Sequence, residues 1–259
     1  MTNLRAIAAT YRWHRGLGHS TRELDNARIV VDRQHPNVWD ANHADTVSAK
    51  TDREIAAVLE ALDDHLAHSD WRVVHTDLFT PEPFVARLAL EGYVEQPAVI
   101  QMALQGRVRA RPATNLRPVE TEDDWSILAN LVARDHDEGL RTGGGGISPD
   151  VTAGIVAGYC AKAPFCRFFL ATSDDEAIGY GSFAAGASGA GIIEDLFTLP
   201  AQRGRGIASG MIAAFADRLQ AEGSSIVFLG ALVSERARHL YAKLGFQPVM
   251  LARTWVRRA

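Results

Sequence analysis

The segment 189–208 constrains the fold of this chain more than any other part of its sequence. A β-rich apolar run ends at Pro200, a basic turn with two glycines follows, and apolar residues then recur at helical spacing from Ile207 to Leu219. A strand, a glycine-rich turn and a helix in this order form an anion cradle. The glycines let backbone N–H groups point inward, and the helix N-terminus adds positive potential. The sequence therefore predicts a diphosphate site in the turn.

The composition of the turn separates the possible phosphate ligands. Arg203 and Arg205 alternate with Gly204 and Gly206, and both arginines can bring full charges to a phosphate. A Walker A loop needs Gly-Lys-Ser or Gly-Lys-Thr, which the chain lacks. A dinucleotide-binding turn needs an acidic residue on a second strand, about twenty positions on, and none follows here. The structural alternative is a glycine-rich connection with two solvated arginines.

Two motifs in the C-terminal half resemble those of the GNAT superfamily of N-acetyltransferases. The turn resembles the family's acetyl-CoA pyrophosphate loop, Arg-x-x-Gly-x-Ala, at Arg203, Gly206 and Ala208. The second hallmark, Asn-x-x-Ala-x-x-x-Tyr-x-x-x-Gly-Phe, is matched at Ala237, Tyr241, Gly245 and Phe246. Ser234 stands where this motif usually has Asn, and its residue type also predicts the N-cap of the helix that follows.

The resemblance implies a GNAT-type acyl-CoA N-acyltransferase fold, an α/β architecture with a mixed sheet. The elements of residues 114–259 follow a complete acetyltransferase order, so this part is expected to be the catalytic domain. Residues 1–110 are expected to be a degenerate GNAT-like domain, as in tandem GNAT proteins. The strand–helix–Gly-Tyr unit at 71–93 resembles the strand–helix–Gly-Phe unit at 227–246. The N-terminal half lacks the glycine-rich turn, and residues 49–53 occupy its place.

The same resemblance implies acetyl-CoA as the co-substrate and no metal. The CoA pyrophosphate is expected on Arg203, Gly204, Arg205, Gly206, Ile207, Ala208 and Ser209. In the family, the fourth strand diverges from the fifth, and its free backbone groups pair with the pantetheine amides. Here those groups belong to Leu196, Phe197 and Thr198, and Ser234 is expected beside the pantetheine arm.

Two side chains are candidates for proton transfer. The family places a tyrosine like Tyr241 beside the thioester sulfur, and a phenol with a pKa near 10 can return a proton to a leaving thiolate. The alternative is a tyrosine that packs in the core. Glu194, on the expected fourth strand, is the candidate general base, and the alternative is a structural carboxylate paired with an arginine. Strand alternation predicts that Asp195 points to the opposite face, so only one of the two carboxylates can serve.

An aromatic and polar cluster in the N-terminal half has no assigned role from the sequence alone. It comprises Trp13, His14, Trp39, Asp40, Asn42 and His43. The cluster either lines an acceptor pocket between the two halves or belongs to surface and core.

Composition restricts the partners. The net charge of −4 and the isoelectric point near 6.1 give no global basic field for nucleic acid or an anionic membrane. No signal-peptide core opens the chain, and Cys160 and Cys166 suit free thiols, so a cytoplasmic location is expected. The sequence thus predicts an acetyl-CoA-dependent N-acetyltransferase that acts by direct transfer on a small-molecule or peptide amine. A non-catalytic acyl-CoA-binding or sensing module and a nucleotide-binding protein are the alternatives, and the oligomeric state is open.

Overall fold

The computed structural model describes residues 3–111, 115–141 and 147–259. The N-terminal half contains α1 (Leu4–Gly16), β1 (Ser20–Glu23), β2 (Arg28–Val31), the 3-10 helix η1 (Trp39–Ala41), β3 (His43–Asp45), α2 (Asp52–His65), β4 (Trp71–Thr76), α3 (Glu82–Leu90), β5 (Val94–Glu95) and β6 (Val99–Leu104). The C-terminal half contains β7 (Asn115–Pro118), α4 (Glu122–Arg141), α5 (Pro149–Lys162), β8 (Arg167–Ser173), β9 (Glu176–Ala185), β10 (Ala190–Thr198), η2 (Pro200–Gln202), α6 (Ile207–Ala221), β11 (Ile226–Leu232), α7 (Ala237–Leu244) and β12 (Phe246–Arg258). This mixed α/β architecture confirms the predicted fold class.

Helix starts mostly follow the capping chemistry of the sequence. The Ser148 hydroxyl accepts a hydrogen bond from Val151 N at 3.3 Å and caps α5. The predicted cap of α7 is wrong. That helix begins after Arg236, and no side chain caps it. Glu235 N instead donates to Leu232 O at 2.9 Å, so the chain first makes a turn after β11 and passes Ser234 before the helix starts.

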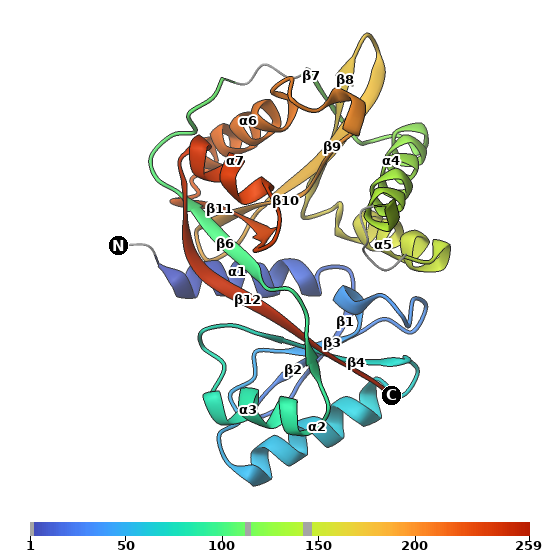
Figure 1. Ribbon diagram of the computed structural model, residues 1–259, viewed down its shortest axis with the longest axis vertical. Coiled ribbons are helices and arrows are strands. Elements are labelled where there is room, and N and C mark those ends of the chain that lie inside the picture. The colour runs from blue at the N-terminus through green and yellow to red at the C-terminus, as the bar shows by residue number, and fades with distance from the viewer. Residues whose placement is uncertain (1–2, 112–114, 142–146) are drawn as a thin grey trace.

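The described strands form one sheet in the order β1-β2-β3-β4-β12-β6-β11-β10-β9-β8-β7, with β5 beside β12. Strand β6, from the N-terminal half of the chain, lies between β11 and β12. The long strand β12 pairs with β6 through Phe246–Ala252 and with β4 through Arg253–Arg258, so it runs from one half of the molecule into the other (Figure 1).

Helices cover both faces of the C-terminal part of the sheet. Phe169, Ile193 and Leu229 pack in one core with α6 and α7, whereas neighbouring strand residues such as Phe168 and Ile192 pack in a second core with α1 and α4. This division follows from the alternation of side chains along a strand. Helix α1 therefore belongs to the C-terminal core, although it opens the chain, and Figure 1 shows it between the two halves.

The N-terminal part has its own core, in which α2 and α3 cover β2, β3 and β4. Trp255 of β12 completes this core, and its indole N–H donates to Thr76 Oγ1 at 3.1 Å. Segments from before residue 110 thus pack with the C-terminal half, and β12, from after residue 114, packs with the N-terminal half. The division into domains 1–110 and 114–259 stays a prediction. Within the described ranges, no helix is long and apolar enough to cross a membrane.

Candidate active site

The site begins where two neighbouring strands diverge. Strand β10 pairs in parallel with β11 only from Ala190 to Ile193, but it continues along β9 as far as Thr198. The register along β9 shifts between Glu194 and Phe197, and Asp195 has a φ of 55°. This irregularity is a β-bulge, which bends a strand and re-aims its side chains. Beyond Ile193, the edge of β10 that faces β11 is therefore left without a strand partner.

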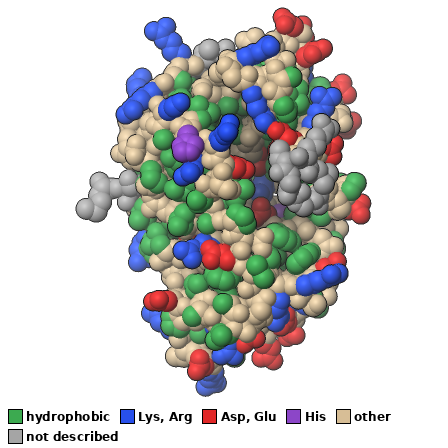
Figure 2. Space-filling view, in the orientation of Figure 1, with side chains coloured by type: hydrophobic (Ala, Val, Ile, Leu, Met, Phe, Trp, Pro, Cys, Tyr) green, Lys and Arg blue, Asp and Glu red, His purple; other side chains and the backbone are tan. Residues whose placement is uncertain are grey.

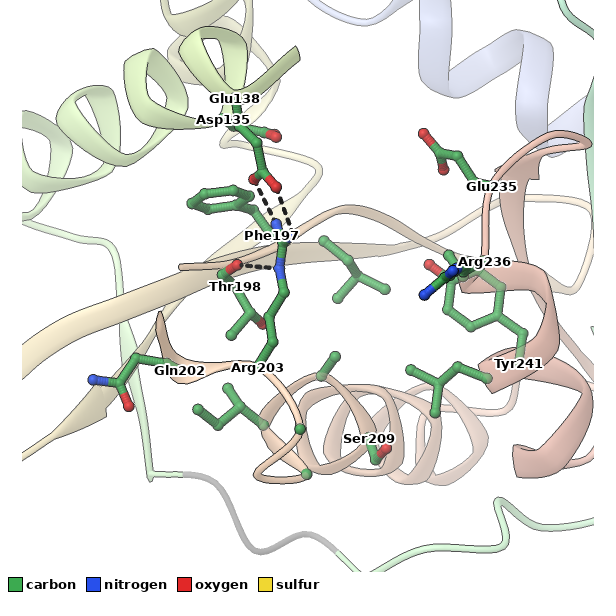
Figure 3. A pocket seen from close by; sticks show the side chains of 17 residues that line it. Asp135, Glu138, Phe197, Thr198, Gln202, Arg203, Ser209, Glu235, Arg236 and Tyr241 are labelled. Carbon is green, nitrogen blue, oxygen red and sulfur yellow. Dashed lines mark hydrogen bonds and ion pairs between the residues drawn. The ribbon is translucent and has the colours of Figure 1, made fainter. Parts of the chain in front are cut away.

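A groove of about 890 Å³ opens at this divergence. Most of the residues predicted to bind acetyl-CoA line it: Leu196, Phe197, Thr198, Arg203, Gly204, Gly206, Ile207, Ala208 and Ser209. Arg205 and Ser234 do not line it. In Figure 3, Arg203 and Tyr241 lie on opposite sides of the groove. The sequence argument missed Asp135, Gln202, Glu235 and Arg236, which also line it.

The basic turn has the backbone of an anion cradle. Gly204 and Gly206 have φ values of 77° and 83°, in the left-handed region that L residues rarely adopt. A Cβ atom at either position would meet nothing within 4 Å, so open space surrounds this part of the turn. Helix α6 begins directly after Gly206, which places the N–H groups of its first turn and the positive end of its dipole at the groove wall. This geometry fits the pyrophosphate of CoA.

Arg203 fixes the turn through three hydrogen bonds. Its two terminal nitrogens donate to both carboxylate oxygens of Glu138 at 2.6 Å, and its Nε donates to Thr198 O at 3.0 Å. Figure 3 shows these contacts from α4 to the loop. A bidentate pair of this kind is geometrically specific. Because Glu138 balances the charge of Arg203, the attraction for an anion rests largely on the backbone, with Arg236 as a further cation at the groove.

Tyr241 joins a buried ring to an accessible hydroxyl. The residue is 7% exposed, and its ring contacts Phe246 in the core beneath α7. Its hydroxyl makes no hydrogen bond to a described residue, yet Tyr241 lines the groove. Burial, with added repulsion from Glu194 and Glu235, raises the pKa of Tyr241 above its usual value. The phenol therefore stays protonated at neutral pH and is able to act as an acid.

A second cavity of about 300 Å³ lies on the other side of β10. Its walls come from α1, η1, α4, α5 and β10, and Asp135 and Leu196 line both this cavity and the groove. The two spaces therefore adjoin there. In Figure 2 this face of the molecule is hollowed at mid-height, and side chains of both charges are visible inside. We call this space the inner cavity.

Glu194 and Asp195 both line the inner cavity, so the prediction that they face opposite sides is wrong. The bulge at Asp195 breaks the alternation. Asp195 is held by Tyr159 Oη and Ser182 Oγ, which both donate to it at 2.8 Å. The Glu194 carboxylate forms no ion pair or hydrogen bond with a described residue. Burial, together with the Asp195 charge, raises the pKa of Glu194 to about 8.

The polar cluster of the N-terminal half divides between the site and its surroundings. His14 and Asp40 line the inner cavity, as an acceptor pocket between the halves requires. Asn42 instead bonds to backbone groups, donating to His35 O at 2.9 Å and Val38 O at 3.1 Å. The remaining three side chains pack elsewhere: His43 against His75, Trp39 against Trp71, and Trp13 against the core of α1.

Across the described residues, no cluster of three or more His, Cys, Asp or Glu side chains has the arrangement of a metal site. The groove and the inner cavity are instead lined by backbone groups, carboxylates, phenols and single cations.

Comparisons with known proteins agree with this geometry. Residues 143–246 match the Acetyltransferase (GNAT) family. A GCN5-related N-acetyltransferase from Kribbella flavida is 17% identical, with a TM-score of 0.69 over 100% of this chain and 97% of that one. A conserved protein of unknown function from Staphylococcus epidermidis is 11% identical, with a TM-score of 0.68 over 93% of this chain and 94% of that one.

A further structural relative is a tandem GNAT protein from the clavulanic acid biosynthesis pathway. It is 14% identical, with a TM-score of 0.59 over 90% of this chain and 78% of that one. No curated protein sequence matches the chain. These likenesses span both halves of the molecule, whereas the family match covers most of the residues that line the groove. The chain therefore carries a GNAT acetyltransferase domain, and as a whole it has the fold of GNAT N-acetyltransferase structures, a tandem GNAT protein among them.

Proposed function

We propose that the protein is an acetyl-CoA-dependent N-acetyltransferase that transfers the acetyl group directly to a small-molecule or peptide amine. One observation carries this proposal: the groove and the inner cavity adjoin at Leu196 and Asp135, with Tyr241 lining the groove and Glu194 lining the cavity. A thioester in the groove and an amine in the cavity would then meet at β10. Holding two reactants together in one complex removes much of the entropic barrier to their reaction.

The groove residues position acetyl-CoA, which supplies an activated acetyl thioester. The unpaired edge of β10 at Leu196, Phe197 and Thr198 offers backbone groups to the pantetheine amides. The turn from Arg203 to Ser209 offers N–H groups and the helix dipole to the pyrophosphate. Arg205 is close in sequence and exposed, so we place it at the outer phosphates.

Glu194 and Tyr241 move the protons. An amine reaches the inner cavity as an ammonium ion, and the Glu194 carboxylate accepts its proton. The amine nitrogen then bonds to the acyl carbon, the carbon–sulfur bond breaks, and Tyr241 donates a proton to the departing thiolate. Glu194 passes the first proton to solvent, and the second proton lost by the nitrogen restores the Tyr241 phenol, so that one proton is released overall. Because the pKa of Glu194 is raised to about 8, this base is better matched to an ammonium than an ordinary glutamate is.

We propose that residues 1–110 act as a degenerate GNAT-like domain, whose role is to close the acceptor side. Helix α1 and η1 provide Tyr11, His14 and Asp40 to the inner cavity. We infer a reducing cytoplasm as the working compartment, because Cys160 and Cys166 are both free.

The rival function is a non-catalytic acyl-CoA sensor. A sensor needs the groove alone, whereas the chain also has an adjoining cavity with a carboxylate of raised pKa. A panel of amines, with thiol release from acetyl-CoA as the readout, tests the proposal. We expect release that depends on the amine and on Glu194. Tight acetyl-CoA binding with no amine-dependent release across the panel would favour the sensor.

A further inference from the structure

Lys162 is a buried cation with no hydrogen-bonded partner among the described residues. It is the last residue of α5, it is 8% exposed, and it lines the inner cavity. Its ammonium group forms no hydrogen bond, and no ion pair within 4.0 Å, with a described residue. Buried charges are normally paired and hydrogen-bonded, because desolvation is costly. An anionic or polar group of a ligand in the cavity would supply the hydrogen-bond acceptor that Lys162 lacks.

Nearby carboxylates stabilise the charge of the buried Lys162 side chain, but none of them accepts a hydrogen bond from its ammonium group. Its field lowers the pKa of Asp195 and of Glu194, against the larger effect of burial. Asp195 has its own donors, Tyr159 and Ser182, each at 2.8 Å. Lys162 is thus a counter-charge at a distance, and its three N–H donors remain available to a ligand.

Other cations of the cavity are already engaged. Arg15 donates to Tyr11 Oη at 2.8 Å, and its Nε lies 3.6 Å from Asp40 Oδ1. His14 is buried beside Lys162, and both effects lower its pKa well below the usual value, so it is neutral at physiological pH. Lys162 is therefore the cation of the described cavity that is best placed to bind an anionic group.

The cavity consequently offers two opposite recognition elements. On β10, Glu194 suits an ammonium group, and at the end of α5, Lys162 suits an anion. A volume of about 300 Å³ is at the lower end for small-molecule sites, which commonly measure about 300–1,000 Å³. We propose that the acceptor is a small zwitterion, a primary amine that also carries a carboxylate or phosphate group. In this proposal, which rests on the proposed function, the amine faces Glu194 and the acidic group bonds to Lys162.

Matched acceptors test this inference. The pairs are glycine and methylamine, γ-aminobutyrate and butylamine, and O-phosphoethanolamine and ethanolamine, each assayed by thiol release from acetyl-CoA. We expect kcat/KM about 10- to 100-fold higher for the zwitterion of at least one pair, the range that hydrogen bonds to a charged group provide. The carboxylate and phosphate pairs show which acidic group the site takes.

The matched variants are Lys162→Met and Lys243→Met. Lys243 lies in the last turn of α7 and is exposed, so it controls for the loss of one lysine near a helix C-terminus. Lys162→Met should raise KM for the zwitterion by about 10- to 100-fold and leave KM for the neutral amine within about twofold. Lys162→Arg, which keeps a charge, should retain part of the preference if Lys162→Met does not fold.

Two outcomes would overturn the inference. One is equal or better kcat/KM for the neutral amines, and the other is an equal loss for both members of a pair in Lys162→Met, which a counter-charge alone would give. If no amine releases thiol although acetyl-CoA binds, the proposed function fails separately. Binding of γ-aminobutyrate to the CoA-loaded protein, measured by calorimetry on wild type and Lys162→Met, then still tests recognition of the zwitterion.

Discussion

Tyr241 can be tested by removing its hydroxyl alone. Tyr241→Phe keeps the ring that packs against Phe246 and removes the hydroxyl that we propose as the proton donor. General acids contribute about 10²–10⁴-fold, so we expect kcat to fall in that range while the Kd for CoA stays unchanged. Steady-state kinetics with the best amine, together with calorimetry, measure both. Tyr93 is the matched control, because it is also buried with an unpaired hydroxyl, and Tyr93→Phe should leave kcat unchanged. Wild-type turnover in Tyr241→Phe, with chemistry rate-limiting, would remove Tyr241 from the mechanism.

The protonation of Glu194 predicts a pH dependence of the reaction. Tyr11, Arg15, Asp40, Lys162, Asp195 and Tyr241 are the charged and titratable groups that act on it. Burial dominates and raises its pKa to about 8. Because a base works only when deprotonated, kcat/KM should rise as pH increases through about 8 in wild type. Glu194→Gln should have a lower kcat/KM without this rise. A rise of the same shape in Glu194→Gln would assign the titration to another group.

Glu194 should also influence the free energy of unfolding. An unfolded glutamate titrates near 4.5, whereas folded Glu194 keeps its proton to about 8. The folded state thus binds more protons between these values, and stability falls as pH rises through this window. We expect Glu194→Gln to melt at a higher temperature than wild type at pH 9 but not at pH 4. If the Tm of Glu194→Gln differed from that of wild type by the same amount at pH 4 and pH 9, the pKa of Glu194 would not be raised in the folded state.

At the scale of elements, the junction of the turn and α6 is the part that we propose to bind the phosphates of CoA. Gly206→Glu forces a side chain into a left-handed residue and adds a carboxylate at the helix N-terminus. We expect CoA affinity to fall by at least about tenfold, which is a loss of about 1.4 kcal/mol in binding free energy. Gly223→Glu is the control, because Gly223 also has a positive φ in open space, at the other end of α6. Unchanged CoA affinity in folded Gly206→Glu would contradict the assignment.

The elements also show how far the sequence alone can predict the site. The turn at 203–209 and Tyr241 carry local signals, namely glycine spacing and a helical motif, and the groove contains most of them. The bulge at Asp195 has no such signal, because it arises where β10 leaves β11 but stays beside β9. The alternation rule therefore failed at Asp195, which lines the inner cavity together with Glu194.

Lys162 and Arg15 were missed for a different reason. They come from separate helices, and only the packing of α1 onto the C-terminal sheet brings them to one cavity. No spacing rule relates residues so far apart in the chain. Glu138 was missed likewise, since its partner Arg203 is 65 positions away.

At the scale of the whole molecule, β12 couples the stability of the two halves. Trp255 is 7% exposed, packs in the N-terminal core and belongs to a strand that also pairs with β6. Trp255→Ala should cost about 3–5 kcal/mol in unfolding free energy, as large-to-small core changes of this kind do. We expect one cooperative transition, shifted as a unit in the variant, by circular dichroism and tryptophan fluorescence. Two separate transitions, with only one shifted, would show that the halves unfold independently.

The whole chain should bind one equivalent of CoA. In the N-terminal half, the N-terminus of α2 corresponds to that of α6, but a side chain of the protein occupies it. Helix α2 begins after Thr51, and the carboxylate of Glu54 accepts hydrogen bonds from Lys50 N at 2.8 Å and Thr51 N at 2.9 Å. These bonds lower the pKa of Glu54 and keep it ionised. The N–H groups that would hold a phosphate thus already bind a carboxylate of the protein, which also repels an incoming anion.

The intact chain is the right sample for this measurement, because a fragment that ends near Arg111 would lose Trp255 and the strand beside β4. Calorimetry should give a stoichiometry of one CoA per wild-type chain. Gly206→Glu should weaken that single binding event by at least about tenfold and reveal no second one. Glu54→Ala, which exposes the N-terminus of α2, should add no second equivalent, since residues 49–53 lack the glycines that turn N–H groups inward. Two equivalents in wild type would place a second CoA site in the N-terminal half.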